Sequence, residues 1–289
     1  MKELVILSGK GGTGKTSIAS SFAVLAPNKV IVDCDVDAAN MHLLLAPRQL
    51  AATDFAGRKK AVIDSTRCSR CGRCSAVCRF NAISDYHVDP HACEGCGTCL
   101  LVCRKEAIRL EDTVAGRWFA SETAYGLLVH ARLEPGAENS GKLVAEVREA
   151  ARRLADKMGH SLILSDGPPG IGCPVISSLS GAAMALLVTE PSASALGDLE
   201  RVLGLCRHFN IPARVCINKW DLSASVAAQV EQRCQELGAP VVGRVVFDPT
   251  VLASIEMGRP PVVEPRGPAA EQIRALWYRI SDELGIVPT

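Results

Sequence analysis

The sequence predicts an α/β protein with a mostly parallel, doubly wound sheet that a small cysteine-rich segment interrupts. Two observations predict this fold class. Short apolar runs such as Leu4–Leu7 alternate with segments of helical periodicity, as in sheets whose parallel strands are buried on both faces. Eight of the 13 cysteines then lie between Cys68 and Cys103, where this alternation stops.

The expected elements follow a βαβ rhythm on either side of the cysteine-rich segment. The chain opens with the strand Leu4–Leu7, the helix Lys15–Leu25 and the strand Val30–Val32. The rhythm resumes with a strand near Phe119 and a helix over Ser140–Met158. Further strands are expected at Leu162–Leu164, Ala185–Val188, Val215–Ile217 and Val241–Val246, and further helices at Leu196–Phe209, Val226–Leu237 and Ala269–Leu284.

Composition excludes several classes of protein. The 32 Lys and Arg residues nearly balance the 31 Asp and Glu residues, so no global field favours nucleic acid or an anionic membrane. No apolar run reaches the ~18 residues of a membrane span, and the first run is too short for a signal peptide. The last helix has a mainly acidic polar face, which favours packing on the sheet over membrane binding. We expect a cytoplasmic protein whose clustered cysteines are reduced.

A phosphate-binding motif follows the first strand. Gly9-Lys10-Gly11-Gly12-Thr13-Gly14-Lys15-Thr16 fits the pattern G-x-x-x-x-G-K-[ST] and lies where a strand leads into a helix. Its glycines allow successive N–H groups to point at phosphate oxygens, and the helix N-terminus adds partial positive charge. Lys15 is expected to reach the β- and γ-phosphates and Thr16 to ligate Mg²⁺, with Ser17 completing the cofactor-binding segment.

Lys10 distinguishes this loop from an ordinary one. A second lysine at this place resembles the deviant Walker motif of the MinD/ParA superfamily of P-loop ATPases, which includes nitrogenase iron protein and is related to Mrp-type iron–sulfur carriers. The resemblance implies that the chain binds ATP or ADP with Mg²⁺ and hydrolyses ATP slowly until a partner docks. It also implies a homodimer around the nucleotide with Lys10 acting in trans, or a heterodimer with a related ATPase. A solvated surface lysine is the alternative.

The resemblance extends to the segment after the second strand. Asp33 to Asn40 looks like switch I, in which a carboxylate orients the attacking water. Asp35 matches that catalytic position best. Asp37 is a second candidate, for the Mg²⁺ shell or for coupling to a partner, whereas Asp33 suits a capping role at the strand end. These carboxylates, with Lys10 and Lys15, form the predicted catalytic set.

Three later segments complete the resemblance. Asp166-Gly167-Pro168-Pro169-Gly170 is similar to the Walker B and switch II segment, which implies that Asp166 holds Mg²⁺ through water and that Gly170 moves when the γ-phosphate leaves. Asn218 matches the base-contacting asparagine. Asp248 lies in a loop that matches the segment closing over the adenine.

The cysteines form a tandem repeat. Cys68-x₂-Cys71-x₂-Cys74-x₃-Cys78 recurs 25 residues later as Cys93-x₂-Cys96-x₂-Cys99-x₃-Cys103. In two-cluster ferredoxins the fourth cysteine of each repeat ligates the cluster of the other repeat. We therefore expect two 4Fe–4S clusters, one on Cys68, Cys71, Cys74 and Cys103 and the other on Cys93, Cys96, Cys99 and Cys78. Structural zinc is the alternative, although zinc sites rarely need eight cysteines in this rhythm.

Cysteine density places an insert at residues 58–112, and the resemblance implies that it is a ferredoxin-like α+β domain within a P-loop ATPase domain over residues 1–57 and 113–289. Arg79 and Arg104 follow the fourth cysteines, where the family usually has proline, and their charge is expected to raise the cluster potentials.

Cys173 resembles one cluster ligand of nitrogenase iron protein. Asn139 stands where the second ligand would be, so a cluster shared between subunits is not expected.

Three functions are compatible with these motifs. The first is ATP-gated electron transfer to or from a protein redox partner. The second is an ATP-dependent carrier or maturation factor that delivers an iron–sulfur or metal centre to a protein acceptor, with Cys173 as a transfer ligand. The third is a ParA-like positioning ATPase whose clusters sense redox state. The third function is weakened because the chain lacks a basic surface run beyond Arg58-Lys59-Lys60 and lacks a basic amphipathic terminal helix.

Overall fold

A computed structural model describes residues 1–134, 137, 140–263 and 267–286. The chain divides into two compact units, which are treated separately below. The first unit comprises Met1–Ala52, Trp118–Arg132 and Ser140–Thr289, and the second comprises Thr53–Arg117 and Leu133–Asn139. The second unit is wider than the segment 58–112 expected from cysteine density. It also includes a few residues on either side of that segment, and Leu133–Asn139.

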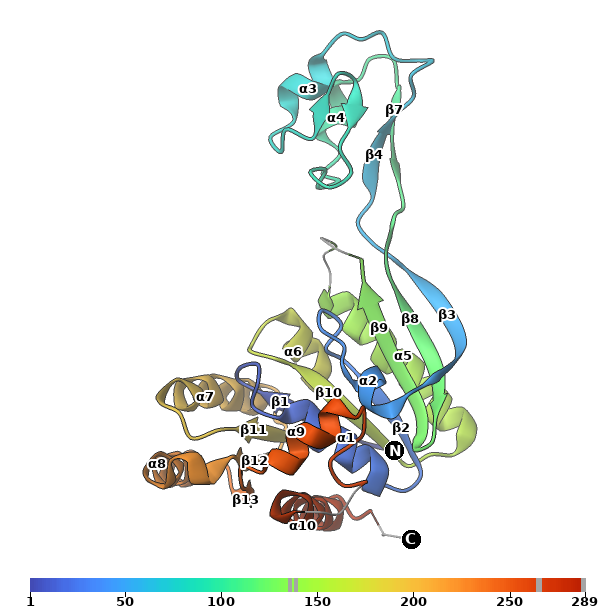
Figure 1. Cartoon of the computed structure of the whole chain (residues 1–289). Helices are drawn as coiled ribbons and strands as arrows, with labels where there is room; N and C mark the ends of the chain where they lie inside the picture. Colours follow the sequence, from blue (N-terminus) through green and yellow to red (C-terminus); the bar gives the residue numbers. More distant parts are fainter. Residues whose placement is uncertain (135–136, 138–139, 264–266, 287–289) are drawn as a thin grey trace. The chain divides into compact units, whose positions relative to one another are not determined.

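The first unit is built on a large sheet (Figure 1). Its strand order is β13 (Val241–Val245), β12 (Ala213–Asn218), β11 (Met184–Thr189), β1 (Lys2–Ser8), β10 (Leu162–Pro169), β2 (Lys29–Asp33), β9 (Gly126–Leu133), β8 (Val114–Thr123) and β3 (Arg48–Ala56). All pairs from β13 to β9 are parallel. Strands β8 and β9 are joined by two residues, and so short a connection requires an antiparallel hairpin. The predicted α/β fold with a mostly parallel sheet is confirmed.

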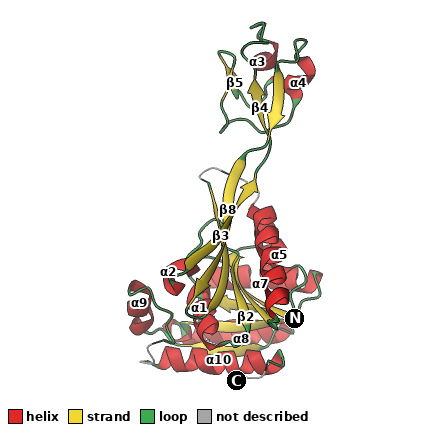
Figure 2. Ribbon diagram, turned by 90° about the vertical axis from the view of Figure 1, so that its right-hand side faces the viewer, coloured by secondary structure: helices red, strands yellow, loops and turns green. Residues whose placement is uncertain are grey.

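Helices cover both faces of this sheet (Figure 2). On β1, Leu4 and Ile6 face one core cluster, which includes residues of α1 (Lys15–Leu25) and α10 (Pro268–Glu283). Val5 and Leu7 face a second cluster with residues of α6 (Cys173–Leu179), α7 (Ala193–His208) and α8 (Ala224–Glu236). Because strand side chains alternate between faces, an uninterrupted apolar strand requires such cover on both sides. The other helices of the first unit, within its described residues, are α2 (Met41–Leu45), α5 (Ser140–Met158), η1 (Trp220–Leu222) and α9 (Pro249–Glu256).

The order of the central strands places a crevice at their carboxyl ends. The connection from β1 through α1 to β2 passes over β10, whereas the connection from β10 through α6 to β11 passes over β1. The chain therefore leaves these neighbouring strands in opposite directions. In open α/β sheets, ligands bind outside the carboxyl ends of the strands at such a switch point. The phosphate-binding motif follows β1 at this position.

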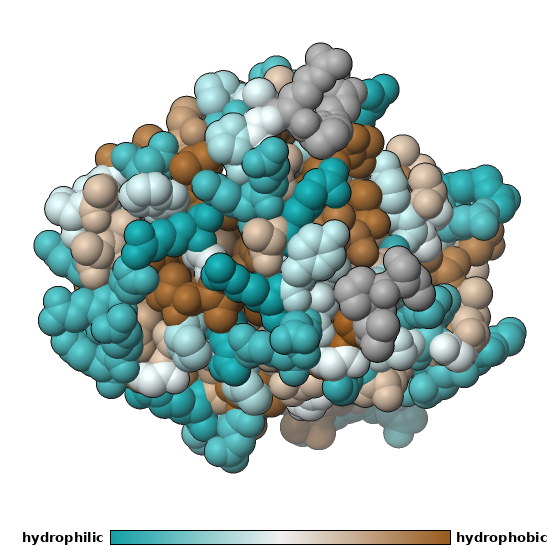
Figure 3. Space-filling view, turned by 90° about the horizontal axis from the view of Figure 1, so that it is seen from below, coloured by the Kyte–Doolittle hydropathy of each residue, from teal (hydrophilic) through white to brown (hydrophobic). Residues whose placement is uncertain are grey.

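The C-terminal helix packs on the sheet, as its polar face predicts. Ala269, Ala270, Ile273, Leu276 and Trp277 of α10 are all buried, and the Trp277 ring lies 5.1 Å from the Phe22 ring of α1. Hydrophilic side chains cover most of the face drawn in Figure 3, where apolar ones form small separate areas. Within the described residues, no helix is long and apolar enough to cross a membrane.

The second unit is small and rich in cysteine. Two antiparallel pairs, β4 (Lys60–Ile63) with β7 (Ile108–Glu111) and β5 (Ile83–Ser84) with β6 (His87–Val88), accompany the short helices α3 (Arg73–Val77) and α4 (Thr98–Val102). The core of this unit consists of Ala61, Cys74, Ala82, Ile83, Cys93, Cys99 and Ile108. So few apolar side chains give little stability, and units of this size usually need a metal or disulfides to stay folded.

The sequence repeat of this unit is also a conformational repeat. Left-handed backbone occurs at Arg70, Gly72 and Asn81, and again 25 residues later at Gly95, Gly97 and Glu106. The N–H groups of Ala82 and Ala107 donate to Cys78 Sγ at 3.4 Å and Cys103 Sγ at 3.3 Å, in matching positions. The two halves therefore fold alike around their cysteines.

Candidate functional site

The phosphate-binding loop is packed too tightly for side chains at two of its glycines. Gly14 has φ +88°, and a Cβ there would lie 2.2 Å from Asn218 Nδ2. A Cβ on Gly9 would lie 2.4 Å from Asp198 Cβ on α7. Gly12 also adopts left-handed backbone, with φ +81°. This backbone is the kind that turns successive N–H groups toward one anion.

Asp166 holds the two residues predicted to bind phosphate and Mg²⁺. Lys15 Nζ donates to Asp166 Oδ1 at 2.7 Å, and Thr16 Oγ1 donates to Asp166 Oδ2 at 2.8 Å. Burial opposes the charge on Lys15, but Asp166, Asp35 and Asp33 outweigh it and raise the pKa of this lysine. Lys15 is therefore a fixed cation at the carboxyl ends of β1 and β10.

The predicted switch I residues differ in burial. Asp33 is fully buried and accepts N–H bonds from Asp35, Asn40 and Met41, each at 3.1 Å. Burial and the nearby Asp166 raise the pKa of Asp33 to about 7, although Lys15 opposes this. Asp33 therefore organises the loop backbone, in keeping with the capping role considered for it.

Asp35 and Asp37 occupy different surroundings. Asp35 Oδ2 lies 3.9 Å from Lys15 Nζ, and burial raises the pKa of Asp35 against the opposing charge of Lys15. Asp37 is exposed. Of these two predicted catalytic carboxylates, Asp35 is thus the one beside the phosphate-binding lysine.

Lys10 is held within its own chain by residues that the sequence did not single out. Its Nζ lies 2.7 Å from Glu190 Oε1 and donates to Ser192 Oγ at 3.0 Å. Lys219 Nζ reaches Glu190 Oε2 at 3.5 Å and donates to the Gly12 carbonyl at 3.0 Å. Although burial opposes it, the two lysines lower the pKa of Glu190. Glu190 could have been found from its position directly after the β11 strand, where polar side chains reach the crevice.

The other predicted nucleotide-binding residues lie around the same loop. Asn218 is buried at the end of β12, and its Nδ2 donates to the Thr13 carbonyl at 2.8 Å. Asp248 begins α9, where Oδ1 accepts the Thr250 N–H at 2.9 Å. The Gly170 N–H donates to the Ser8 carbonyl at 2.9 Å, and Ser17 is half-buried on α1. Contacts of these residues with a nucleotide stay predictions.

One buried polar atom of the loop has no partner within the described structure. Thr13 Oγ1 is buried and makes no hydrogen bond there. An unpaired buried hydroxyl is costly, so such an atom indicates a group that binds beside it. Together with the backbone of Gly12 and Gly14 and the ammonium of Lys15, it fits a phosphate-bearing ligand.

A stack of rings joins α2, which follows the predicted switch I segment, to the hairpin of β8 and β9. The rings of His42 on α2 and His130 on β9 stack with centroids 5.8 Å apart, and Phe119 of β8 lies 5.1 Å from His130. Burial and the neighbouring His42 lower the pKa of His130 to about 4. Burial and Arg132 also lower the pKa of His42.

This stack predicts a pH dependence of stability. His130 stays neutral in the folded chain at pH values where the unfolded chain binds a proton. Its contribution to the free energy of unfolding is therefore fully present above pH ~6.5 and is lost as the pH falls through ~4. The expected loss is up to about 3 kcal/mol, at 1.36 kcal/mol per pKa unit. Urea unfolding of wild type and His130→Phe between pH 7 and 4 measures it. An equally steep loss in the variant would contradict this assignment.

Two cavities of the second unit are each lined by four cysteines. Cavity A contains Cys68, Cys71, Cys74 and Cys103 in its lining and has a volume of about 180 Å³. Cavity B contains Cys78, Cys93, Cys96 and Cys99 and is smaller, about 20 Å³. In each set, three cysteines come from one repeat and the fourth from the other. Among the described residues, no group of three or more His, Cys, Asp or Glu is spaced to hold a single metal ion.

Hydrogen bonds also converge on these sulfurs. The N–H groups of Arg70 and Ala61 donate to Cys68 Sγ at 3.4 Å and to Cys93 Sγ at 3.5 Å. Cys96 Sγ lies 3.4 Å from the Thr98 hydroxyl, which lowers the pKa of that thiol. Donors of this kind favour thiolates and are among the factors that set cluster potentials.

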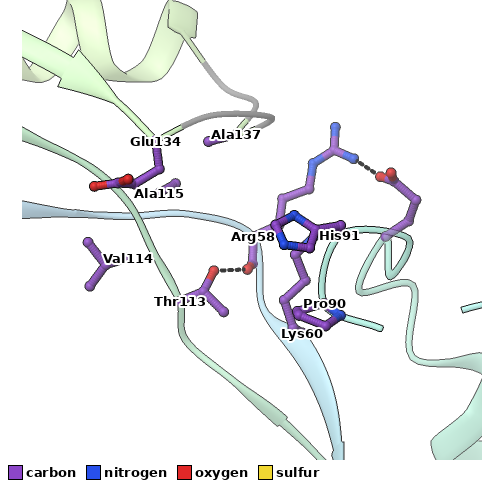
Figure 4. A pocket seen from close by; sticks show the side chains of 10 residues that line it. Arg58, Lys60, Pro90, His91, Thr113, Val114, Ala115, Glu134 and Ala137 are labelled. Atoms are coloured by element: carbon purple, nitrogen blue, oxygen red, sulfur yellow. Dashed lines mark hydrogen bonds and ion pairs between the residues drawn. The ribbon is translucent and has the colours of Figure 1, made fainter. Parts of the chain in front are cut away.

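A third cavity of the second unit was not expected from the sequence. It has a volume of about 210 Å³, and Figure 4 shows Arg58, Lys60 and His91 grouped on one side of it, with Glu134 on the other. Lys60 Nζ donates to the Cys93 carbonyl at 2.5 Å. Because its lining mixes both signs of charge, this cavity selects no particular class of ligand.

The cysteines outside the repeat fall into two groups. Cys34, Cys206, Cys216 and Cys234 are buried and pack as small apolar side chains. Cys173 is exposed at the start of α6. Asn139, at the place of the absent second ligand, lies outside the described residues.

The doubly wound sheet, with a glycine-rich loop, Lys15 and Thr16 at its switch point, defines a P-loop nucleotide-binding protein. Residues 4–262 match the CobQ/CobB/MinD/ParA nucleotide binding domain. The chain belongs to this family.

Individual relatives agree with this assignment. An uncharacterized protein of Methanocaldococcus jannaschii is 37% identical over 223 residues, which are 75% of this chain and 78% of that protein. Septum site-determining protein MinD of Bacillus subtilis is 22% identical over 290 residues, which are 97% of this chain and 89% of that protein. The solved structure of MinD from Pyrococcus horikoshii with Mg-ADP has a TM-score of 0.62 at 18% identity and covers 99% of this chain and 98% of that one. The fold of this chain is thus similar to that of MinD.

Proposed function

We propose that this protein hydrolyses ATP with Mg²⁺ and couples the hydrolysis to electron transfer through two 4Fe–4S clusters, held by the cysteines of cavities A and B. The observation that carries the proposal is the sorting of eight cysteines into two cavities, each with three cysteines of one repeat and one of the other. This crossed arrangement is the ligand pattern of two-cluster ferredoxins.

The nucleotide site supports slow hydrolysis. Lys15 neutralises charge on the β- and γ-phosphates, and Mg²⁺ supplies further charge compensation when bound. Thr16 and Asp166, which hydrogen-bond each other at 2.8 Å, are the oxygen donors that would hold the ion, directly and through water. Asp35 accepts a hydrogen bond from the attacking water and orients it. Because phosphoryl transfer depends mainly on positioning and charge, these groups suffice for a low basal rate.

The donor set of the second unit suits iron–sulfur clusters better than a structural zinc ion. A zinc ion uses four ligands at about 2.3 Å, whereas each cubane cluster spreads its four thiolates around a larger body. Cavity A has the room for such a body. When bound, the clusters supply one-electron chemistry, and the cysteines and their N–H donors fix the position and potential of each cluster.

A chain of contacts offers a route for coupling. Asp33 binds the backbone of Met41, and the next residue, His42, stacks on His130 of β9. Strand β8 pairs with β9 and leads along the chain toward the cysteine segment. A movement of switch I on loss of the γ-phosphate would thus reach the strand that leads into the second unit.

Anaerobic purification followed by iron and sulfide analysis tests the clusters. Rapid mixing of the reduced protein, freed of excess dithionite, with a one-electron acceptor of higher potential such as cytochrome c, with Mg-ATP or Mg-ADP, tests the gating. The proposal expects cluster-bound iron and faster electron loss with Mg-ATP. Equal rates of electron loss with and without nucleotide would contradict the proposal that ATP gates the transfer.

Lys10 gives a further prediction. If it acts in trans across a nucleotide dimer, Lys10→Ala should abolish ATP-dependent dimerisation and reduce hydrolysis about tenfold or more, with ATP affinity nearly unchanged. Glu190→Gln removes the carboxylate that holds Lys10 at 2.7 Å and should instead favour dimerisation. Light scattering and ATPase assays measure both. If the Lys10 variant dimerised as wild type does, the role in trans would be refuted, and the ion pair with Glu190 of the same chain would be the remaining role of Lys10.

Two alternative functions remain as outcomes of these assays. The exposed Cys173 favours an ATP-dependent carrier or maturation factor, and release of iron and sulfide to an apo-acceptor on ATP addition would support that role. A ParA-like positioning ATPase would instead show ATP-dependent dimerisation with no effect of nucleotide on electron transfer or cluster release. A protein redox or cluster-acceptor partner is needed in the first two cases, and no nucleic acid or membrane partner is proposed.

A further inference from the structure

The two four-cysteine cavities differ in the charges around them. Cavity A is also lined by Arg73, Arg104 and Lys105, and its described lining contains no acidic residue. Cavity B has neither lysine nor arginine among its described lining residues, where Glu94 is the one carboxylate and pairs with Arg58. Arg79 lies 5.9 Å from the ring centroid of Phe80, which lines cavity B, so fewer positive charges surround this cavity than cavity A. The similar folds of the two repeats therefore present different electrostatic surfaces.

Two more arginines extend the charge around cavity A. The guanidinium of Arg70 lies 5.9 Å from the ring centroid of Tyr86, which lines the cavity. Arg67 directly precedes Cys68 and lies 3.6 Å from Glu106. We call the five exposed residues Arg67, Arg70, Arg73, Arg104 and Lys105 the basic rim.

Three of the five rim charges are not required by the fold of the repeat. The positions 25 residues after Arg67, Arg70 and Arg73 carry Ala92, Gly95 and Thr98. Both short helices nevertheless begin in the same way, after Gly72 with φ 73° and Gly97 with φ 77°. The local backbone therefore does not need the charges of Arg67, Arg70 and Arg73.

The rim also lacks compensating charge. Within the described part of the chain, Arg67 is the one rim residue paired with a carboxylate, and its partner Glu106 is 86% exposed. Five like charges around one cavity repel one another and create a local positive potential, even though the net charge of the chain is only +1.

We propose that the basic rim is the docking surface for a redox protein with an acidic surface, and that electrons enter and leave the second unit through cavity A. This rests on the proposed function, in which cavity A holds a cluster. Complementary charge steers such partners and raises their association rates by about 10 to 10³-fold. A protein suits the rim better than nucleic acid does, because five charges on a nearly neutral chain would neutralise few phosphates.

The step transfers one electron and forms no bond. A reduced acidic donor loses one electron, and the oxidised, cluster-loaded protein gains it. The rim cations attract the donor and also stabilise the added negative charge near cavity A.

The test uses a variant copied from the second repeat. Arg67→Ala, Arg70→Gly and Arg73→Thr together give repeat one the residues of repeat two, and glycine suits position 70, where φ is +54°. The control removes three exposed positive charges from the first unit through Arg153→Ala, Lys157→Thr and Arg201→Thr. Both variants change the net charge equally.

The probe is a dithionite-reduced plant-type [2Fe–2S] ferredoxin, which is strongly acidic, and the full-length, cluster-loaded chain is its acceptor. Surface binding to immobilised ferredoxin and stopped-flow electron transfer are measured from 20 to 300 mM NaCl. We expect the rim variant to bind at least tenfold more weakly at low salt and to lose most of its salt dependence. The control variant should match wild type.

Three results would overturn the proposal: equal effects of the rim and control variants, salt-independent binding of wild type, or tighter binding of a 20-nucleotide RNA than of ferredoxin. Iron and sulfide analysis before each measurement distinguishes a failure of the proposed function from a failure of the docking surface. Absence of clusters would refute the proposed function. Normal cluster content with unchanged binding would refute only the docking surface.

Discussion

The double variant Cys71→Ser/Cys103→Ser is expected to retain one cluster, whereas Cys71→Ser/Cys78→Ser should lose both. Cys71 and Cys103 line the same cavity, so removing both damages only cavity A. Cys78 lines cavity B, so the second variant damages each cavity once. Iron content should therefore fall from about eight to about four atoms per chain in the first variant and to nearly zero in the second.

The two variants control for each other, because each loses two cysteines and one of them is Cys71 in both. Anaerobic iron and sulfide assays with electron paramagnetic resonance of the reduced proteins measure the result. The reverse order would show that each repeat binds its own cluster without crossing. Equal loss in both would show that neither cavity keeps a cluster alone, which the small shared core would explain.

The second large effect is expected at switch I. Asp35→Asn should reduce the ATP hydrolysis rate about 10²- to 10⁴-fold while leaving the dissociation constant for ATP within about threefold. The physical reason is that Asp35 lies 3.9 Å from the phosphate-binding Lys15, where its carboxylate can orient a water, while Lys15 itself provides the binding. Lys15→Ala should abolish nucleotide binding.

Asp37→Asn is the matched comparison, because it removes a carboxylate two residues away that is exposed. Its effect on basal hydrolysis should be the smaller of the two, and any loss should concern stimulation by a partner. Steady-state ATPase assays and nucleotide titration by fluorescence measure both variants. A larger loss in Asp37→Asn would assign the water-orienting role to Asp37.

Elements with strong local signals were predicted from the sequence. The helices over Lys15–Leu25 and Ser140–Met158 are observed with those bounds, and β1, β2, β10, β11, β12 and β13 occur where apolar runs predicted buried strands. In each of these elements, the spacing of apolar residues within the segment shows whether it is a helix or a strand, so the element can be recognised without knowledge of distant contacts.

Other elements were not predicted. Strand β3 (Arg48–Ala56) has eight exposed residues of nine, with one buried residue, Phe55, and so shows no alternation in its sequence. Strand β9 (Gly126–Leu133) and the short helices α2, α6 and α9 were also missed. Edge strands and short helices form because a partner is already in place, and that partner is distant in sequence or supplied by tertiary packing.

The candidate nucleotide site shows the same division. The motifs identified Lys15, Thr16 and Asp166, and the structure brings all three within hydrogen-bond distance. The motifs did not reveal that Lys10 is held by Glu190, a residue 180 positions away. The parallel strands β1 and β11 bring these two side chains to the same end of the sheet.

By itself, the sequence predicted a phosphate-binding loop, an α/β sheet and a duplicated cysteine motif, because each of these features follows from the spacing of residues that are close in sequence. The crossed grouping of the cysteines was already expected from the pattern of two-cluster ferredoxins, whereas the tertiary structure alone decided which charges surround each cavity. Arg73, Arg104 and Lys105 come from opposite repeats, and only the folding of one repeat against the other joins them at cavity A. Local spacing fixes which chemistry a chain carries, whereas packing between distant segments decides where that chemistry is exposed to a partner.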